Sequence, residues 1–280
     1  MARGAGMITR FAPSPTGPLH LGHAFSALTA WGRAQAAGGT FLLRIEDIDT
    51  PRCRPAFEAA IFEDLRWLGL DWPEPVMRQS ERMPAYRAAL GRLAGLGVLY
   101  PCRCTRGDIR AALSAPQEGA DALPYPGTCR GRPMAEAGEG CAIRLDIARA
   151  CALAEPLSFR ETGPLHEGIH ALDAATIAAD GGDIVLARRD IGTSYALAVT
   201  VDDAAQGVTE VVRGADLFAA TGVQVLLRRL LGLPVPEFHH HRLIRDADGR
   251  RLAKRDDARA LAALRAEGAR PADIRAMVGL

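Results

Sequence analysis

The residues that point most clearly to chemistry are two histidines near the start of the chain. Residues 10–23 read Arg-Phe-Ala-Pro-Ser-Pro-Thr-Gly-Pro-Leu-His-Leu-Gly-His, and His20 and His23 open a proline-free stretch rich in helix formers. A helix N-terminus offers free backbone N–H groups and a positive dipole end, and imidazoles there can donate to phosphate oxygens. Gly22 lets a flat ring approach the backbone between them. The segment predicts a nucleotide phosphate site, with a turn capped by two histidines as the alternative.

The composition singles out one further residue. Of the 34 basic residues, 33 are arginine and the remaining one is Lys254, in the run Arg-Leu-Ala-Lys-Arg-Asp over residues 251–256. A lysine in such an arginine-rich chain suggests that this position needs a compact ammonium group on a flexible side chain rather than a planar guanidinium group. The alternative is a solvated basic turn.

These two segments resemble the two signatures of the class I aminoacyl-tRNA synthetases, most closely the glutamyl branch. The resemblance implies that ATP is bound by His20, Gly22, His23 and Lys254, and that the two histidines and the lysine are catalytic because they meet charge developing on the phosphates. The second segment departs from the family pattern, since Arg251 replaces a lysine and Ala253 and Arg255 replace serines.

Carboxylates and arginines elsewhere suit an amino acid that carries two carboxylates. The run Arg-Ile-Glu-Asp-Ile-Asp over residues 44–49 follows an expected strand at 40–46, and arginine binds carboxylates through two parallel hydrogen bonds. The resemblance implies that Glu46 recognises the amino group of glutamate, and Asp49 is interpreted as a helix cap. The full glutamate site implied by the resemblance is Arg10, Phe11, Ala12, Pro13, Ser14, Glu46, Tyr195 and Arg213.

The six cysteines favour a metal or structural thiols over disulfides, because the chain shows no export signal. Cys102, Cys104 and Cys129 suggest a structural zinc ion, one per chain, which requires four ligands. Chemistry alone favours Cys141 as the fourth ligand, whereas the resemblance points to Tyr125. Three reduced thiols without metal are the alternative.

The arrangement of apolar stretches predicts an α/β fold. Strands alternate with helices over residues 8–96, which is typical of a doubly wound, Rossmann-like parallel sheet with ligands at the carboxyl ends of its strands. Residues 99–187 are interpreted as an insertion that contains the zinc site, between catalytic halves at 1–98 and 188–280. In the second half we expect a turn at Asp202 and Asp203 and a helix over 217–231. Two short helices are expected within 257–280.

Composition limits the classes of function. With 280 residues, 48% hydrophobic residues and 24% charged residues, the chain can bury a core and is not disordered. It has no apolar run of membrane-spanning length and no secretory signal, so we expect a cytoplasmic monomer without membrane contact. The net charge of +1 means that an RNA partner requires a local basic patch.

Within the resembled family, the short end of the chain discriminates between members. Residues 257–280 are too few for the anticodon-binding domain of a tRNA-charging ligase, because about 50 residues is the floor for a domain. The chain therefore resembles the glutamyl-queuosine tRNA(Asp) synthetases. That resemblance implies activation of L-glutamate by ATP and Mg²⁺ to glutamyl-adenylate, then transfer to the queuosine base at the wobble position in the anticodon loop of tRNA(Asp). The alternatives are a truncated ligase that charges a tRNA 3′ end and a non-catalytic RNA-binding paralogue.

Overall fold

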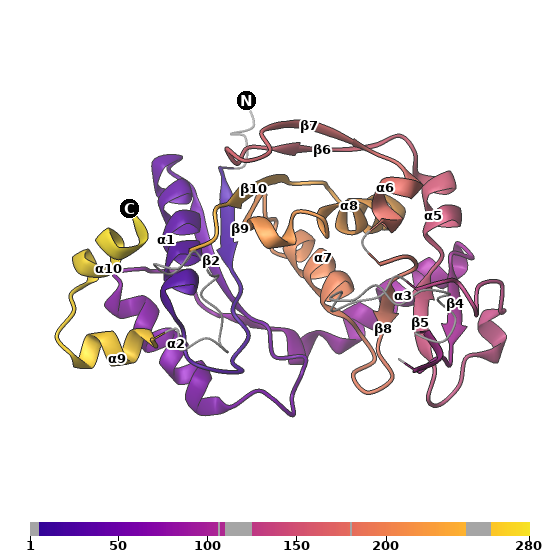
Figure 1. Ribbon diagram of the computed structural model, residues 1–280, viewed down its shortest axis with the longest axis horizontal. Helices are drawn as coiled ribbons and strands as arrows, with labels where there is room; N and C mark the ends of the chain where they lie inside the picture. The colour runs from indigo at the N-terminus through magenta and orange to yellow at the C-terminus, as the bar shows by residue number, and fades with distance from the viewer. Residues whose placement is uncertain (1–5, 106, 110–124, 180, 245–258) are drawn as a thin grey trace.

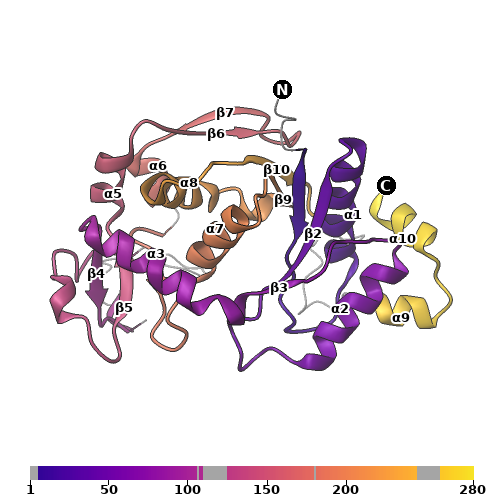
Figure 2. The ribbon, with the colours of Figure 1, turned by 180° about the vertical axis from the view of Figure 1, so that it is seen from behind.

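A computed structural model describes residues 6–105, 107–109, 125–179, 181–244 and 259–280. The molecule is elongated, with its C-terminal helices at one end and the cysteine-rich region at the other (Figures 1 and 2). Within the described residues, no helix has both the length and the apolar character needed to cross a membrane.

The first half forms a parallel three-stranded sheet in the order β1-β2-β3. Its helices form because apolar residues recur on one face, as with Ala24, Leu28 and the other buried side chains of α1. The alternating strands and helices predicted over residues 8–96 are confirmed. They are β1 (Ile8–Phe11), α1 (Leu21–Ala36), β2 (Thr40–Ile45), α2 (Pro55–Trp67), β3 (Met77–Arg78), the 3-10 turn η1 (Gln79–Arg82) and α3 (Met83–Gly95).

The second half contributes a four-stranded sheet in the order β7-β6-β10-β9. Strands β9 (Glu210–Gly214), β10 (Glu237–His241) and β6 (Leu157–Glu161) are parallel, and β7 (Gly168–Leu172) is antiparallel to β6. Strand β6 comes from the residues interpreted as the insertion, yet it pairs with β10 of the second half. The division at residues 98 and 187 stays a prediction.

The two sheets meet where β1 and β9 lie side by side. Thr209 N–H donates to the Ile8 carbonyl at 2.9 Å, and further along Arg10 Nη1 donates to the Val212 carbonyl at 3.2 Å. The carboxyl ends of β1, β2, β9 and β10 consequently open on one edge of the core, which is where ligands bind in sheets of this kind. The expected parallel-sheet α/β core is therefore confirmed.

The expected turn at Asp202 and Asp203 is wrong. Both residues lie inside α7 (Tyr195–Ala205), which Ser194 caps by accepting from Leu197 N–H at 3.4 Å. Aspartates favour turns when they are solvated, but here their carboxylates are buried against arginine and tyrosine partners that keep them helical. The helix expected from residue 217 also begins later, as the 3-10 turn η3 (Ala215–Leu217) precedes α8 (Thr221–Leu231).

The cysteine-rich end is built on an antiparallel sheet in the order β4-β5-β8. Its elements are β4 (Leu99–Cys102), η2 (Met134–Glu136), β5 (Ala142–Leu145), α5 (Ile147–Ala154), α6 (Ala174–Ala178) and β8 (Val185–Ala187). At the opposite end, α9 (Leu261–Ala266) and α10 (Pro271–Val278) confirm the two expected short helices, and they join the hydrophobic core of α1 and α2.

Candidate active site

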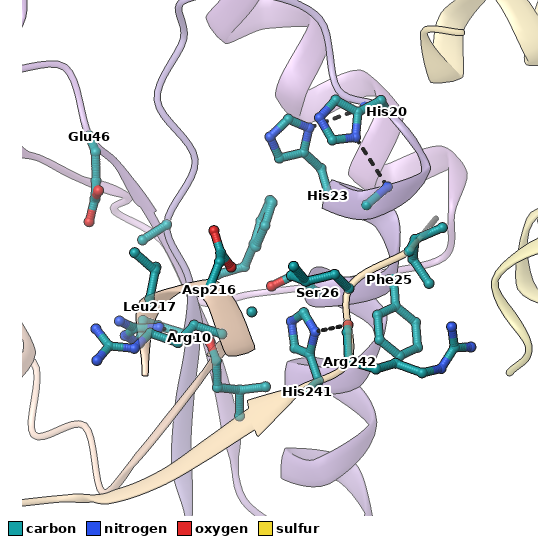
Figure 3. A pocket seen from close by; sticks show the side chains of 18 of the residues that line it. Arg10, His20, His23, Phe25, Ser26, Glu46, Asp216, Leu217, His241 and Arg242 are labelled. Carbon is teal, nitrogen blue, oxygen red and sulfur yellow. Dashed lines mark hydrogen bonds between the residues drawn. The ribbon is translucent and has the colours of Figure 1, made fainter. Parts of the chain in front are cut away.

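A cavity of about 380 Å³ lies at the shared edge of the core, between the carboxyl ends of β1, β9 and β10 and the start of α1. Figure 3 shows Glu46 and Arg10 on one side of this pocket and His20 and His23 on the other. The cavity brings together most of the predicted site residues, namely Arg10, Phe11, Ala12, His20, Gly22, His23, Glu46, Tyr195 and Arg213.

The two histidines are held by the helix that they begin. His20 is the N-cap of α1, where its Nδ1 accepts from Gly22 N–H at 3.1 Å, and the His20 N–H donates to Nδ1 of His23 at 3.2 Å. Their ring centroids lie 3.8 Å apart. A Cβ at Gly22 would lie 3.1 Å from the His20 ring, so a glycine at this position permits the close approach of ring and backbone. The pair presents imidazole and helix N-terminus on the same side of the cavity.

A buried carboxylate organises the arginine side of the cavity. Asp203 accepts from Arg10 Nε at 3.0 Å and from Arg44 Nη1 at 2.8 Å, and Arg228 lies 3.4 Å away. All four side chains are at most 5% exposed. Burial alone would raise the pKa of Asp203, but the three guanidinium groups hold it well below its ordinary value. Arg10 and Arg44 are therefore fixed by a permanent negative charge.

The same network reaches Glu46, which lies on the same side of the cavity as Arg10 (Figure 3). Arg44 Nη2 donates to Glu46 Oε1 at 3.2 Å, and the Glu46 N–H donates to the Pro13 carbonyl at 2.9 Å. Burial raises the pKa of Glu46, and the positive charges of Arg44 and Arg10 oppose that rise. The carboxylate is thereby held at the cavity wall, where it can bind an ammonium group.

Arg213 differs from Arg10 in the partners that hold it. Its three side-chain nitrogens donate to His240 Nε2 at 2.9 Å, Gln224 Oε1 at 2.9 Å and Thr221 Oγ1 at 2.8 Å, all of them neutral acceptors. Burial lowers the pKa of Arg213, and the positive charge of Arg10 adds to that effect. A buried cation whose described hydrogen-bond partners are neutral favours an anionic ligand.

His240 orients the side chain of Arg213 through a hydrogen bond. Its Nδ1 lies 2.5 Å from Glu161 Oε2, and a carboxylate can only accept, so the ring proton is on Nδ1 and Nε2 is free to accept from Arg213. Burial lowers the pKa of His240 to about 4, and the charge of Arg213 acts in the same direction. The ring is therefore neutral near neutral pH. The next residue, His241, also lines the cavity.

Two predicted residues, Pro13 and Ser14, do not line this cavity. Pro13 is buried and borders neither this cavity nor the neighbouring one, which Ser14 lines. Lys254 falls outside the described residues. The chain on either side of its segment meets the site, because Ile244 lines the cavity and Ala260 forms a β-bridge with His20.

Sequence reasoning missed Asp203 and Arg44. An arginine inside the apolar strand Thr-Phe-Leu-Leu-Arg-Ile is a signal that could have been used, because a buried guanidinium requires a buried acceptor. No comparable signal marked Asp203, since adjacent aspartates are also typical of turns.

A separate cluster of thiols lies at the cysteine-rich end. The sulfur atoms of Cys102, Cys104 and Cys129 all lie within 4.8 Å of one another, so the three could hold a metal ion. The hydroxyl of Tyr125 lies 3.5 Å from Cys102 Sγ and 3.8 Å from Cys104 Sγ. Cys141 is outside the cluster, and its sulfur accepts from Arg103 Nε at 3.4 Å. The geometry suits a tetrahedral ion, whose thiolate sulfurs stand about 3.8 Å apart.

Comparison with known proteins identifies the family of this chain. Residues 6–280 match the family described as tRNA synthetases class I (E and Q), catalytic domain. The chain belongs to this family. The histidines at the start of α1 and the glutamate and arginines of the cavity therefore lie in a chain of this family.

Individual relatives are similar over most of their length. A glutamyl-Q tRNA(Asp) synthetase from Rhodobacter capsulatus is 58% identical, with 98% of this chain and 100% of the relative covered. Another protein of that name, from Geobacter sulfurreducens, is 44% identical, with 92% and 78% covered. The structure of a glutamate-tRNA synthetase from Elizabethkingia anophelis superimposes with a TM-score of 0.78 at 29% identity, and covers 98% of this chain. This chain spans 61% of that structure.

The buried His240 predicts a pH dependence of this synthetase's stability. Its pKa is about 4 in the folded chain against an ordinary 6.5, so between these values the unfolded chain binds a proton that the folded chain does not. Stability from this group is complete above pH 6.5 and falls as the pH decreases, by up to about 1.4 kcal/mol per pH unit. Urea unfolding of the wild type and His240→Gln at about pH 7 and about pH 5 measures the difference.

The exposed Leu153 provides the control, because Leu153→Gln introduces the same side chain without removing a titratable group and should leave the pH slope of the wild type unchanged. Equal slopes for the wild type and His240→Gln would show that His240 is not held neutral in the folded chain.

Proposed function

We propose that this chain activates L-glutamate with ATP and transfers it to the queuosine base at the wobble position of tRNA(Asp). The observation that carries the amino-acid part is the arrangement of charges in the cavity. Two buried guanidinium groups, those of Arg10 and Arg213, line the same cavity as Glu46, so one ligand can contact all three. Glutamate offers two carboxylates and one ammonium group, which is the complement of this set. The acceptor is taken from the relatives that match over nearly their whole length.

The histidine side of the cavity suits the phosphates of ATP. His20 and His23 present imidazoles at a helix N-terminus, and Lys254 lies in a segment whose flanking residues Ile244 and Ala260 both meet this site. We assign phosphate binding to these three side chains. Mg²⁺ would accompany ATP, and its charge would neutralise part of the charge on the phosphates.

The reaction then proceeds in two displacements. An oxygen of the glutamate α-carboxylate attacks the α-phosphorus of ATP, and the bond to pyrophosphate breaks as pyrophosphate leaves with its electron pair. A hydroxyl of queuosine then attacks the carbonyl carbon of glutamyl-adenylate, an ester bond forms, and AMP leaves while its phosphate takes the hydroxyl proton. The protein contributes position and positive charge rather than a nucleophile.

Zinc is the ion we assign to the thiol cluster. Thiolate sulfur is the preferred zinc ligand, and Cys102, Cys104 and Cys129 supply three of the four ligands. The hydroxyl of Tyr125 is the fourth, because it adjoins Cys102 and Cys104 whereas Cys141 pairs with Arg103. When bound, the ion would hold the segment around Cys129 against strand β4, at the end of the molecule away from α1 (Figure 1).

Transfer of labelled glutamate tests the proposed function directly. The purified protein is offered tRNA(Asp) with queuosine, tRNA(Asp) without it, and tRNA(Glu), each with ATP and Mg²⁺. We expect label only on the queuosine-bearing tRNA, and removal of the 3′-terminal adenosine from that tRNA should not prevent labelling. Label on tRNA(Glu) would instead identify a small charging ligase, and no label on any tRNA would favour a non-catalytic paralogue.

Asp203→Asn is expected to raise the KM for glutamate in ATP–pyrophosphate exchange by about tenfold to a hundredfold, because a shift of a substrate-binding group costs this much. The reason is that Asp203 holds both Arg10 and, through Arg44, Glu46. The matched control is Asp202→Asn, since Asp202 is equally buried on the same helix but accepts from Tyr86 and Arg82. An equal KM change in both variants would show a general loss of folding instead.

Metal analysis of the purified chain should find about one zinc ion per molecule. Cys129→Ser and Tyr125→Phe should lower the zinc content and the melting temperature, because each removes a ligand. Cys141→Ser should leave both unchanged, since its sulfur lies outside the cluster. Loss of zinc in Cys141→Ser but not in Tyr125→Phe would reverse the assignment of the fourth ligand.

A further inference from the structure

A second cavity, of about 180 Å³, adjoins the first along the same edge of the core. It lies beyond the carboxyl ends of β2 and β3, next to the start of α7. Glu46 and Tyr195 line both cavities, so a ligand in one lies next to a ligand in the other. Neither the histidines nor Arg10 and Arg213 reach this second space, which the proposed binding of ATP and glutamate leaves unused.

Gln79 gives this cavity a buried acceptor that lacks a donor. The side chain is fully buried on the cavity lining, and its Nε2 donates to Asp202 Oδ2 at 3.1 Å. A carboxylate can only accept, so the amide nitrogen must face Asp202 and Oε1 must point elsewhere. Within the described part of the chain, Oε1 accepts no hydrogen bond. A buried acceptor of this kind is costly unless a ligand or water satisfies it.

The remaining walls carry a carboxylate, two arginines and apolar side chains. Asp49, expected from sequence to be only a cap, is 19% exposed. Its partner Arg52 lies 2.6 Å away and is 71% exposed, and Arg188 lies 3.9 Å away. The carboxylate is therefore turned inward while the guanidinium lies at the rim. Ile48 and Ile191 add apolar surface. Such walls suit a small ring that carries a positive charge and several hydrogen-bond donors.

We propose that this cavity binds the acceptor end of the RNA substrate, a five-membered carbocyclic diol joined to the base through a secondary ammonium group. This inference rests on the proposed function, because queuosine is the nucleoside that carries such a group. Asp49 pairs with the ammonium group. Gln79 Oε1, which is closed to solvent in this structure, accepts from a hydroxyl of the diol once the side chain turns toward the ring. The ring packs on Ile48 and Ile191.

The position of this cavity also fits the transfer step. The acceptor hydroxyl has to reach the activated carboxyl of glutamate, and the two cavities share Glu46 and Tyr195 as a common wall. Arg52 and Arg188 stand at the entrance, 71% and 46% exposed, where they can contact phosphates of the RNA. Phosphate contacts orient the loop, whereas Asp49 and Gln79 distinguish queuosine from an unmodified guanine.

The test is Asp49→Asn, which keeps the shape of the side chain and removes its charge. We expect the KM for queuosine-bearing tRNA(Asp) to rise about tenfold, the usual effect of losing one charge-assisted hydrogen bond. Glutamyl-hydroxamate formation with hydroxylamine should stay within about twofold of the wild type, because a small nucleophile needs no diol site. Binding of unmodified tRNA(Asp) should also be unchanged.

The matched control is Asp273→Asn, because Asp273 likewise pairs with an arginine three residues away, on α10. It should behave as the wild type in every assay. An unchanged KM in Asp49→Asn would overturn the proposal, as would an equal loss of unmodified tRNA binding, which would assign Asp49 to general RNA contact. Ile191→Trp, which fills the cavity, should also impair transfer without impairing hydroxamate formation.

Calorimetry with free queuosine nucleoside separates this inference from the proposed function. Binding to the wild type that weakens about tenfold in Asp49→Asn would support the cavity assignment even if tRNA were not glutamylated. Glutamylation by the wild type with no effect of Asp49→Asn on transfer or nucleoside binding would leave the proposed function intact and refute the cavity assignment.

Discussion

The active site depends on one buried negative charge. Asp203 lies among the guanidinium groups of Arg10, Arg44 and Arg228, and each of the four side chains is nearly inaccessible to solvent. Three guanidinium groups could not be buried this closely without a carboxylate between them, since removing one partner of a buried ion pair costs about 3–5 kcal/mol. Because the carboxylate comes from α7 and two of the arginines from β1 and β2, the same charge joins the two halves of the core. Folding and substrate binding therefore depend on the same carboxylate.

Arg213 shows the complementary arrangement. Its described hydrogen-bond partners are neutral, and the carboxylate of Glu161 is joined to it only through His240. This arrangement fixes the orientation of the guanidinium group without neutralising it beside the cavity. Arg10 is held by a carboxylate, whereas Arg213 is held by neutral acceptors. The positive charge of Arg213 is therefore less neutralised, and an incoming carboxylate would be attracted to it more strongly. The arrangement requires His240 to be neutral, because a protonated ring could not accept a hydrogen bond from Arg213.

Much of this site could be predicted from sequence, and the exceptions have physical reasons. The turn and helix around His20 and His23 were predictable because proline, glycine and helix propensity act locally. The resemblance supplied Glu46, Tyr195 and Arg213, which the structure brings to one cavity. Asp203 was missed because its role depends on partners 159 and 193 residues away in the chain. Strand β6 was assigned to the insertion because nothing in its own residues reveals that it pairs with β10. Local patterns predict local structure, whereas buried ion pairs and strand order are decided by distant segments.

The two adjacent aspartates of α7 explain how one helix serves both cavities. Successive residues of a helix point about 100° apart, so Asp202 and Asp203 face different neighbours although they are joined by one peptide bond. Asp203 faces Arg10 and Arg44 beside the first cavity, whereas Asp202 faces Gln79, Arg82 and Tyr86 beside the second. The first residue of the same helix, Tyr195, lies on the wall that the cavities share. A rigid helix thus fixes the distance between the groups that would hold the amino acid and those that would hold its acceptor. A turn at Asp202 and Asp203 would not hold the two carboxylates at this fixed angle. The helical conformation of the pair is therefore needed for each aspartate to reach its own partners.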